Sequence, residues 1–203
     1  MSAANGPILF ENYAYGMTRD EVIASSGASA CPEAPANRLL LCVSGPANFL
    51  GISWREMFWF NNLDELQQIM LIRPDEPVAS LAQAQDALTA NGWRAVFLET
   101  DGAAFDALEE TRRGKAEDVE KDREDFEARA LREKSGLTIY FFPAEFAQKV
   151  MGKAKSYSQA VDSAGENFVM ISLMLDGDNL KLAFTAPLLA RKDALRYGQI
   201  IKR

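Results

Sequence analysis

Apolar runs of strand length, separated by turn residues, recur along the chain and predict an antiparallel sheet. Two pairs of runs predict hairpins, 52–60 with 66–73 around the bend 61–65, and 168–175 with 180–186 around the bend 176–179. Single strands are predicted at 38–43, 93–100 and 136–142, and loops with turn residues at 31–37 and 44–51.

Helix-start signals precede the strands in both halves. Thr18 and Glu21 have the spacing of a capping box, and Gly27 can end the helix in the left-handed conformation. The remaining helices are predicted at 80–92, where Ser80 and Gln83 repeat the capping box, at 103–134, at 143–155 with Pro143 in the first turn, and from Pro187 onward.

These elements predict an α+β fold in which short helices pack on one face of an antiparallel sheet. A helix followed by a hairpin occurs in each half, which suggests an ancient duplication. We therefore expect a first unit at residues 1–74, with a helix and antiparallel strands. Residues 75–203 form a second α+β half, interpreted as a divergent repeat that shares one continuous core with the first.

The predicted strand 52–60 is unusually aromatic, and its two faces differ. Strand side chains alternate, so Trp54, Glu56, Phe58 and Phe60 share one face and Arg55, Met57 and Trp59 share the other. The face with two phenylalanines is expected to pack under the helices. The other face would then stay open, and Trp, Arg and Met are enriched at protein interfaces. In the alternative interpretation, a helix of the second half covers that face.

Charge excludes several classes of partner. The chain has 203 residues, 48% hydrophobic and 25% charged, with a net charge of −7. Nucleic-acid binding needs a basic surface, which this chain lacks, so no nucleic-acid partner is expected. No run approaches 18 consecutive apolar residues, and no membrane span is predicted.

The chain contains no histidine and only two cysteines. Triads of the Ser-His-Asp or Cys-His type are therefore impossible, and histidine zinc sites are excluded. No carboxylate pair stands out as an acid–base couple. The sequence thus predicts no catalytic residue, no metal site and no cofactor, and it disfavours an enzyme. The N-terminus lacks signal-peptide features, which predicts a cytoplasmic protein, or a periplasmic or secreted one if a leader has been removed.

Residues 8–73 resemble a known family of protein inhibitors. The pattern consists of Gly16-Met17-Thr18-Arg19, Val22, Gly27-Ala28, Cys31 and Cys42. It is similar to the β-lactamase inhibitor protein family and, more loosely, to small outer-membrane lipoproteins of the SmpA/OmlA type. The resemblance implies helices on one face of an antiparallel sheet, with the other face concave and open. It also implies a Cys31–Cys42 disulfide, whereas the missing export signal favours two reduced thiols, and both readings stay open.

In that family, the concave face and the loop after the second cysteine grip a partner enzyme through an acidic residue followed by an aromatic one. The corresponding loop here, 44–51, offers Asn48 and Phe49, so the acid is missing, and β-lactamase inhibition is not expected. We instead expect a non-catalytic module that binds an unidentified protein through Asn48, Phe49, Arg55, Met57 and Trp59. The alternatives are a small-molecule-binding or enzymatic domain with a cleft between the halves, and a structural homodimer subunit.

Overall fold

The computed structural model describes residues 6–34, 36–37, 39–73, 77–114 and 118–200. The strands are β1 (Ile8–Phe10), β2 (Tyr13–Ala14), β3 (Leu40–Phe49), β4 (Ile52–Phe60), β5 (Leu66–Arg73), β6 (Trp93–Glu99), β7 (Ala104–Asp106), β8 (Leu137–Pro143), β9 (Met170–Asp176) and β10 (Asn179–Thr185). The helices are α1 (Arg19–Ser26), α2 (Pro77–Ala90), α3 (Ala107–Arg112), α4 (Val119–Glu133), α5 (Ala144–Val150), α6 (Tyr157–Ser163) and α7 (Pro187–Ile200).

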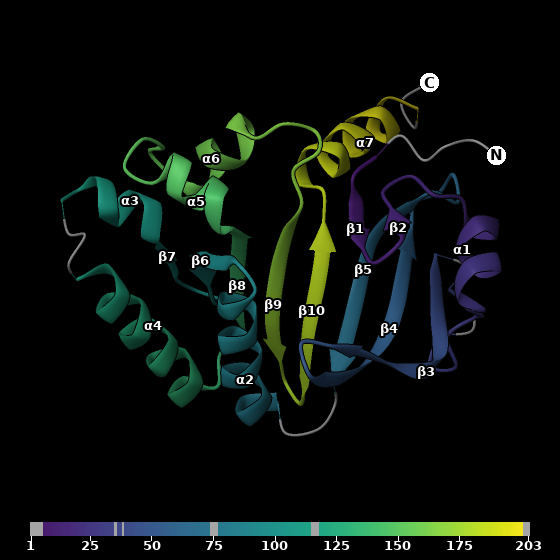
Figure 1. Ribbon diagram of the computed structural model, residues 1–203, viewed down its shortest axis with the longest axis horizontal. Helices are drawn as coiled ribbons and strands as arrows, with labels where there is room; N and C mark the ends of the chain where they lie inside the picture. Colours follow the sequence, from purple (N-terminus) through teal and green to yellow (C-terminus); the bar gives the residue numbers. More distant parts are fainter. Residues whose placement is uncertain (1–5, 35, 38, 74–76, 115–117, 201–203) are drawn as a thin grey trace.

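Eight of the strands form one antiparallel sheet in the order β3-β4-β5-β10-β9-β8-β6-β7, and β1 pairs with β2 in a separate small sheet (Figure 1). The predicted α+β class with an antiparallel sheet is confirmed. Among the residues described, none of the helices combines the length and the apolar character that crossing a bilayer requires.

The short helix α1 has the predicted ends. The Thr18 hydroxyl accepts a hydrogen bond from the Glu21 backbone N–H (3.3 Å), and the Glu21 carboxylate accepts one from the Thr18 N–H (2.9 Å). Gly27 ends the helix with φ 67°, in the left-handed region. Val22 is fully buried, whereas the adjacent Ile23 is 38% exposed. One side chain therefore anchors this helix.

Both predicted hairpins are confirmed, as β4–β5 and β9–β10. Their last strands, β5 and β10, pair with each other, so that the hairpins lie side by side in the middle of the sheet (Figure 1). The expected boundary between the halves, at 74 and 75, lies outside the described residues. The largest apolar cluster contains side chains from both halves, including Phe58, Leu71, Leu182 and Phe141.

The predicted loop 44–51 is wrong in most of its length. Residues 44–49 continue β3, and only Leu50 and Gly51 turn the chain, both with positive φ. The strand carries a bulge between Cys42 and Pro46. Proline has no N–H to donate, but β3 lies at the edge of the sheet, where strands tolerate it. Gly45-Pro46 thus marks a bulge in an edge strand and no loop.

Two helix predictions in the second half also need correction. Helix α2 begins at Pro77, and Ser80, expected as the N-cap, is buried within it. The single helix predicted at 103–134 is divided into the short edge strand β7 and the helices α3 and α4. Helix α6 was not predicted.

One face of the sheet, here called the covered face, carries Trp54, Phe58 and Phe60 of β4 and is buried as expected. The β1–β2 sheet and α1 pack over its β3–β5 end, and α2 and α4 pack over the rest (Figure 1). Glu56 is on the same face and is 6% exposed. Helices α5 and α6 belong to a second apolar cluster on the opposite face, around Phe142.

Candidate functional site

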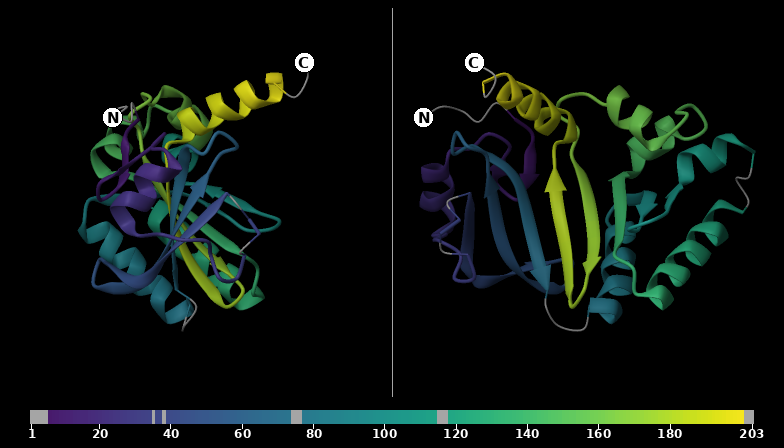
Figure 2. Two further views of the ribbon diagram at one scale, coloured as in Figure 1. Left: turned by 90° about the vertical axis from the view of Figure 1, so that its right-hand side faces the viewer. Right: turned by 180° about the vertical axis from the view of Figure 1, so that it is seen from behind.

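The face opposite the covered face is built from cross-strand rows of side chains. One row runs Arg55, Ile72, Lys181, Met174, Thr138 and Glu99; the next runs Cys42, Met57, Met70, Ala183, Ser172 and Tyr140; and the third runs Leu40, Trp59, Gln68 and Thr185. We call the partly or well exposed members on the central strands the open face: Arg55, Trp59, Gln68, Met70, Lys181, Thr185 and Met174. The right-hand view of Figure 2 shows no helix across β5, β10 and β9.

A disulfide-linked segment covers one end of this face. Cys31 and Cys42 form a disulfide, with an S–S distance of 2.13 Å, and both are buried in a cluster with Met57. Ser29 and Cys42 exchange backbone hydrogen bonds of 3.0 and 2.8 Å, which fix the segment along the outer edge of β3. Arg55 forms an ion pair with Glu33 of the same segment, at 2.9 Å.

Helices α5 and α6 cover the other end through an aromatic cluster. Tyr157 stacks on Phe97, with ring centroids 4.7 Å apart, and on Phe142, at 5.6 Å. The Tyr140 hydroxyl donates a hydrogen bond to the Glu99 carboxylate. Burial raises the pKa of both tyrosines, and Glu99 adds to the effect, so neither phenol ionises near neutral pH.

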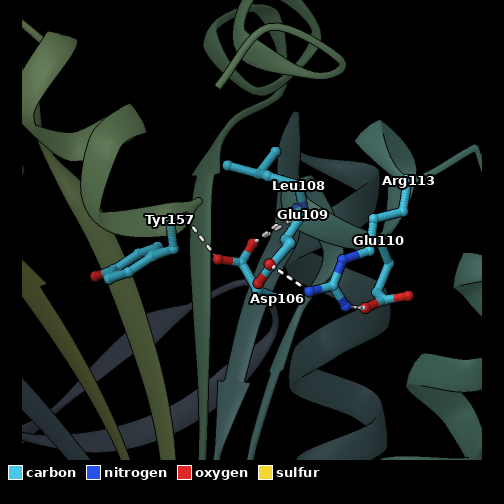
Figure 3. A network of polar contacts seen from close by, with 6 residues as sticks. All are labelled: Asp106, Leu108, Glu109, Glu110, Arg113 and Tyr157. Atoms are coloured by element: carbon cyan, nitrogen blue, oxygen red, sulfur yellow. Dashed lines mark hydrogen bonds and ion pairs between the residues drawn. The ribbon is translucent and has the colours of Figure 1, made fainter. Parts of the chain in front are cut away.

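Asp106 holds the start of α3 against the start of α6 at this end (Figure 3). One carboxylate oxygen caps α3 by accepting from the N–H groups of Leu108 (3.0 Å) and Glu109 (3.2 Å). The other oxygen accepts from the Tyr157 N–H at 2.7 Å. Arg113, at the end of α3, pairs with Glu109 and so closes the network (Figure 3). Every polar contact of Asp106 is therefore structural.

Three of the residues predicted to bind a partner share β4 but differ in access. Arg55 is exposed and Trp59 is 37% exposed, as an open face requires. Met57, between them, is only 6% exposed, because the disulfide covers it. The expectation that Met57 presents itself to a partner is therefore corrected. Among the described residues, this cover comes from the Cys31 segment.

The other two predicted residues, Asn48 and Phe49, are successive residues of the strand β3 and therefore point to opposite faces of the sheet. Phe49 lies on the covered face, where its ring packs against Phe10 (5.2 Å between centroids) and Phe184 (5.5 Å). Its carbonyl oxygen accepts a hydrogen bond from the Trp54 indole N–H at 3.2 Å. Phe49 is thus partly buried against the core and lies on the face opposite the open face. Asn48 is exposed and points to the Arg55 side, at the far end of β3.

Sequence reasoning missed the contributions of β5 and β10. Alternation along β5 assigns Gln68 and Met70 to one face, but only the pairing with β10 brings Gln68 opposite Thr185 and Met70 opposite Ala183. The Thr185 hydroxyl oxygen is buried and has no hydrogen-bond partner within the described residues. Lys181 pairs with Asp176 at 2.5 Å. Strands β5 and β10 are more than a hundred residues apart, and no local sequence pattern predicts that they pair.

A hollow lies at each end of the first cross-strand row, the row that runs from Arg55 to Glu99. The hollow beside Arg55 has about 410 Å³ and is lined by the β3 bulge, Ile72 and Arg73. The hollow at the opposite end has about 280 Å³ and lies beside Met174 and Lys181. The open face therefore combines the apolar side chains of Trp59, Met70 and Met174 with polar neighbours, and it has a basic side chain toward each hollow.

The carboxyl group with the most strongly raised pKa among the described residues lies away from the open face. The buried carboxyl group, Glu56, lies on the covered face beneath Tyr13, where burial first and the charge of Glu11 second raise its pKa to about 7. A larger hollow of about 930 Å³ lies between α2 and α4. It belongs wholly to the second half, so it is not the cleft between the halves that the small-molecule alternative expects.

Comparison with protein-family models, with curated proteins and with solved structures finds no match to this chain. The resemblance to the β-lactamase inhibitor protein family therefore stays a prediction.

Proposed function

We propose that the protein is a non-catalytic module that binds a partner protein on the open face. The observation that carries the proposal is the uncovered centre of a sheet whose two ends are covered. Burial by other elements is the rule for apolar sheet faces, and an exposed apolar patch between polar residues is typical of interaction sites. Trp59 and Met70 supply the apolar contact, and Arg55 supplies a charged rim.

The charges of the open face define the partner's chemistry. Arg55 and Lys181 flank Ile72 in one cross-strand row, and each already holds one carboxylate of this chain, Glu33 or Asp176. Both ion pairs are solvent-accessible, so they cost little to exchange. A partner loop that carries one apolar side chain between acidic residues would place the apolar group against Trp59 and the acids near the two cations.

Site-specific photocrosslinking tests this proposal. A photoreactive phenylalanine analogue replaces Trp59 in one variant and the exposed Leu63 or Val78 in matched control variants. Leu63 lies in the bend between β4 and β5, and Val78 in the first turn of α2. After irradiation in native extract, the Trp59 position is expected to give a specific adduct that both control positions lack.

Three outcomes decide against the proposal. Equal crosslinking at all three positions, or none at Trp59, would show that the open face has no dedicated partner. An adduct of twice the chain mass at Trp59 would instead identify the homodimer alternative, and sedimentation of the purified protein at micromolar concentration would confirm it. A Trp59→Ala chain should also compete poorly with the wild type for the adduct-forming partner.

We further propose that this binding occurs in an oxidising compartment, the periplasm or the cell exterior, and not in the cytoplasm. The support is the Cys31–Cys42 disulfide, which is buried and closes one end of the open face. Structural disulfides persist mainly in oxidising surroundings. Thiol counting on protein isolated from each cell fraction tests this, and two free thiols in the native protein would contradict it.

A further inference from the structure

The hollow between α2 and α4 is a second site, on the covered-face side of the sheet. Its walls are two helical stripes that face each other, residues 82, 85, 86, 89 and 90 of α2 and residues 120, 123, 124, 127, 128 and 131 of α4. Its floor is formed by Trp93, Ala95 and Phe141 of β6 and β8. The volume of about 930 Å³ is that of a small-molecule site.

Alanines among the lining residues leave part of the space between the two helices and the sheet open. Helix α2 is held on the sheet by Leu81, Ala84 and Leu88, and α4 by Phe126 and Ala130. The neighbouring positions that could close the gap are alanines: Ala82, Ala90, Ala95, Ala128 and Ala144. The two helices are thus anchored beside each other on the sheet (Figure 1), with the hollow between them.

One polar network spans this hollow and neutralises its inner cation. The Arg123 guanidinium donates to Glu120 (2.5 Å), to Glu127 (3.3 Å) and to the Gln85 side-chain oxygen (3.4 Å). The Gln85 amide nitrogen donates in turn to Glu127 at 2.6 Å. Arg123 is 15% exposed. Two carboxylates therefore hold it, and it is not available to bind an anion.

Two further carboxylates of the lining lie outside this hydrogen-bond network. Asp86 on α2 and Glu124 on α4 line opposite walls, and both are exposed. Burial lowers the pKa of Arg123, but the charges of its carboxylate neighbours raise it, and Glu124 is one of them, so Glu124 also interacts with that guanidinium. With Arg94 the only other cation of the lining, the hollow carries four carboxylates against two guanidinium groups. Its net charge is negative.

The floor adds a surface suited to a flat cation. Trp93 is half-buried, and its indole lines the hollow next to the buried Phe141. Tryptophan is the strongest cation–π partner among the side chains, and the attraction grows where water is partly excluded.

We propose that the hollow between α2 and α4 binds a small organic cation with a flat apolar body. The body would lie on Trp93 and Ala95, beside the alanines of the two walls. The cationic group would lie between Asp86 and Glu124, the carboxylates outside the Arg123 hydrogen-bond network. This site is separate from the open face, and it stands or falls independently of the proposed protein-binding function.

Calorimetric titration with three isosteric probes tests the proposal: benzamidine, neutral benzamide and anionic benzoate. Benzamidine is expected to bind saturably and about tenfold or more tightly than either isostere, because only the cation gains from the carboxylates and the indole. The Asp86→Asn/Glu124→Gln double variant should lose that preference. Glu145→Gln, an exposed carboxylate of α5 outside the hollow, is the matched control and should retain it.

A variant that fills the hollow keeps the test independent of charge. Ala82 is exposed on a helix, so Ala82→Leu is expected to fold and to reduce benzamidine binding about tenfold. Thermal unfolding checks that each variant is folded. Equal affinity for the three probes, unchanged binding to Ala82→Leu, or no binding of benzamidine to the wild type would each overturn the proposal.

Discussion

At the scale of single residues, Glu56 is the side chain least suited to its surroundings. It is buried on the covered face, one of its oxygens has no hydrogen-bond partner within the described residues, and the neighbours Glu11 and Tyr13 offer no positive charge. Burial raises its pKa from 4.5 to about 7. The folded protein therefore binds the Glu56 proton more tightly than the unfolded chain does.

That shift gives stability a pH dependence with a defined sign. The contribution of Glu56 is fully present below pH 4.5 and is lost as pH rises through about 7. A shift of this size corresponds to about 3 kcal/mol. The Glu56→Gln variant should therefore be about 2–3 kcal/mol more stable than the wild type at pH 8 and nearly equal to it at pH 4.5. Urea unfolding at the two pH values measures this.

Glu145→Gln serves as the control, because it changes an exposed carboxylate of α5 without touching the core. It should follow the wild-type pH profile. Parallel profiles for Glu56→Gln and the wild type would show that the Glu56 carboxyl is solvated in the folded protein.

Trp59 and Phe58 are neighbours on opposite faces of β4 and provide a matched pair of substitutions. Phe58 is fully buried, so Phe58→Ala should cost about 3–5 kcal/mol of unfolding free energy. Trp59 is 37% exposed, and Trp59→Ala should cost no more than about 1–2 kcal/mol, because its side chain is only partly removed from solvent. Chemical denaturation of both variants measures the difference. Equal losses would place Trp59 in the core and remove it from the open face.

At the scale of elements, the sequence predicts those helix ends and hairpins that interactions between neighbouring residues determine. The cap of α1 depends on Thr18 and Glu21, three residues apart, and both hairpins depend on alternation around a polar bend. Residues 44–49 were misread because Gly45-Pro46 is typical of a turn, and only the edge position of β3 makes it a bulge. Met57 was misplaced for a related reason. Its cover, Cys31, comes from a segment 26 positions away along the chain.

Asp106 joins two elements, and its substitution should loosen both. Asp106→Ala removes the cap of α3 and leaves the Tyr157 N–H without an acceptor, which should lower stability by about 2 kcal/mol or more. Asp106→Asn keeps one oxygen for the cap and should lose about half as much. Urea unfolding ranks the variants, and amide hydrogen exchange at Tyr157 reports the local contact. Unchanged exchange in Asp106→Ala would contradict this role.

The disulfide fixes the segment that covers Met57 and one end of the open face. It closes a loop across a sequence separation of 11, so reduction should cost about 2–3 kcal/mol. Denaturant unfolding with and without reductant measures the loss. A Cys31→Ser/Cys42→Ser variant should be insensitive to reductant. Identical midpoints for the reduced and oxidised wild type, together with two titratable thiols in the unreduced protein, would refute the bond.

At the scale of the whole molecule, the pairing of β5 with β10 joins the two halves at the centre of one sheet. Leu71 of β5 lies opposite Leu182 of β10, and both are fully buried in the cluster that the halves share. Separating the halves would expose that apolar surface and leave two unpaired strand edges. We therefore expect the full chain to unfold in one transition, and residues 1–74 alone to remain unfolded.

Two tryptophans allow this cooperativity to be measured half by half. Trp54 lies in the first half and Trp93 in the second, so variants that retain only one of them, with phenylalanine at the other tryptophan positions, report each half separately. Coincident fluorescence transitions in urea, matching the loss of circular dichroism, are expected for a two-state protein. Transitions at different urea concentrations would mean that the halves are independent domains. In that case the β5–β10 junction would be a docking contact and not part of one core.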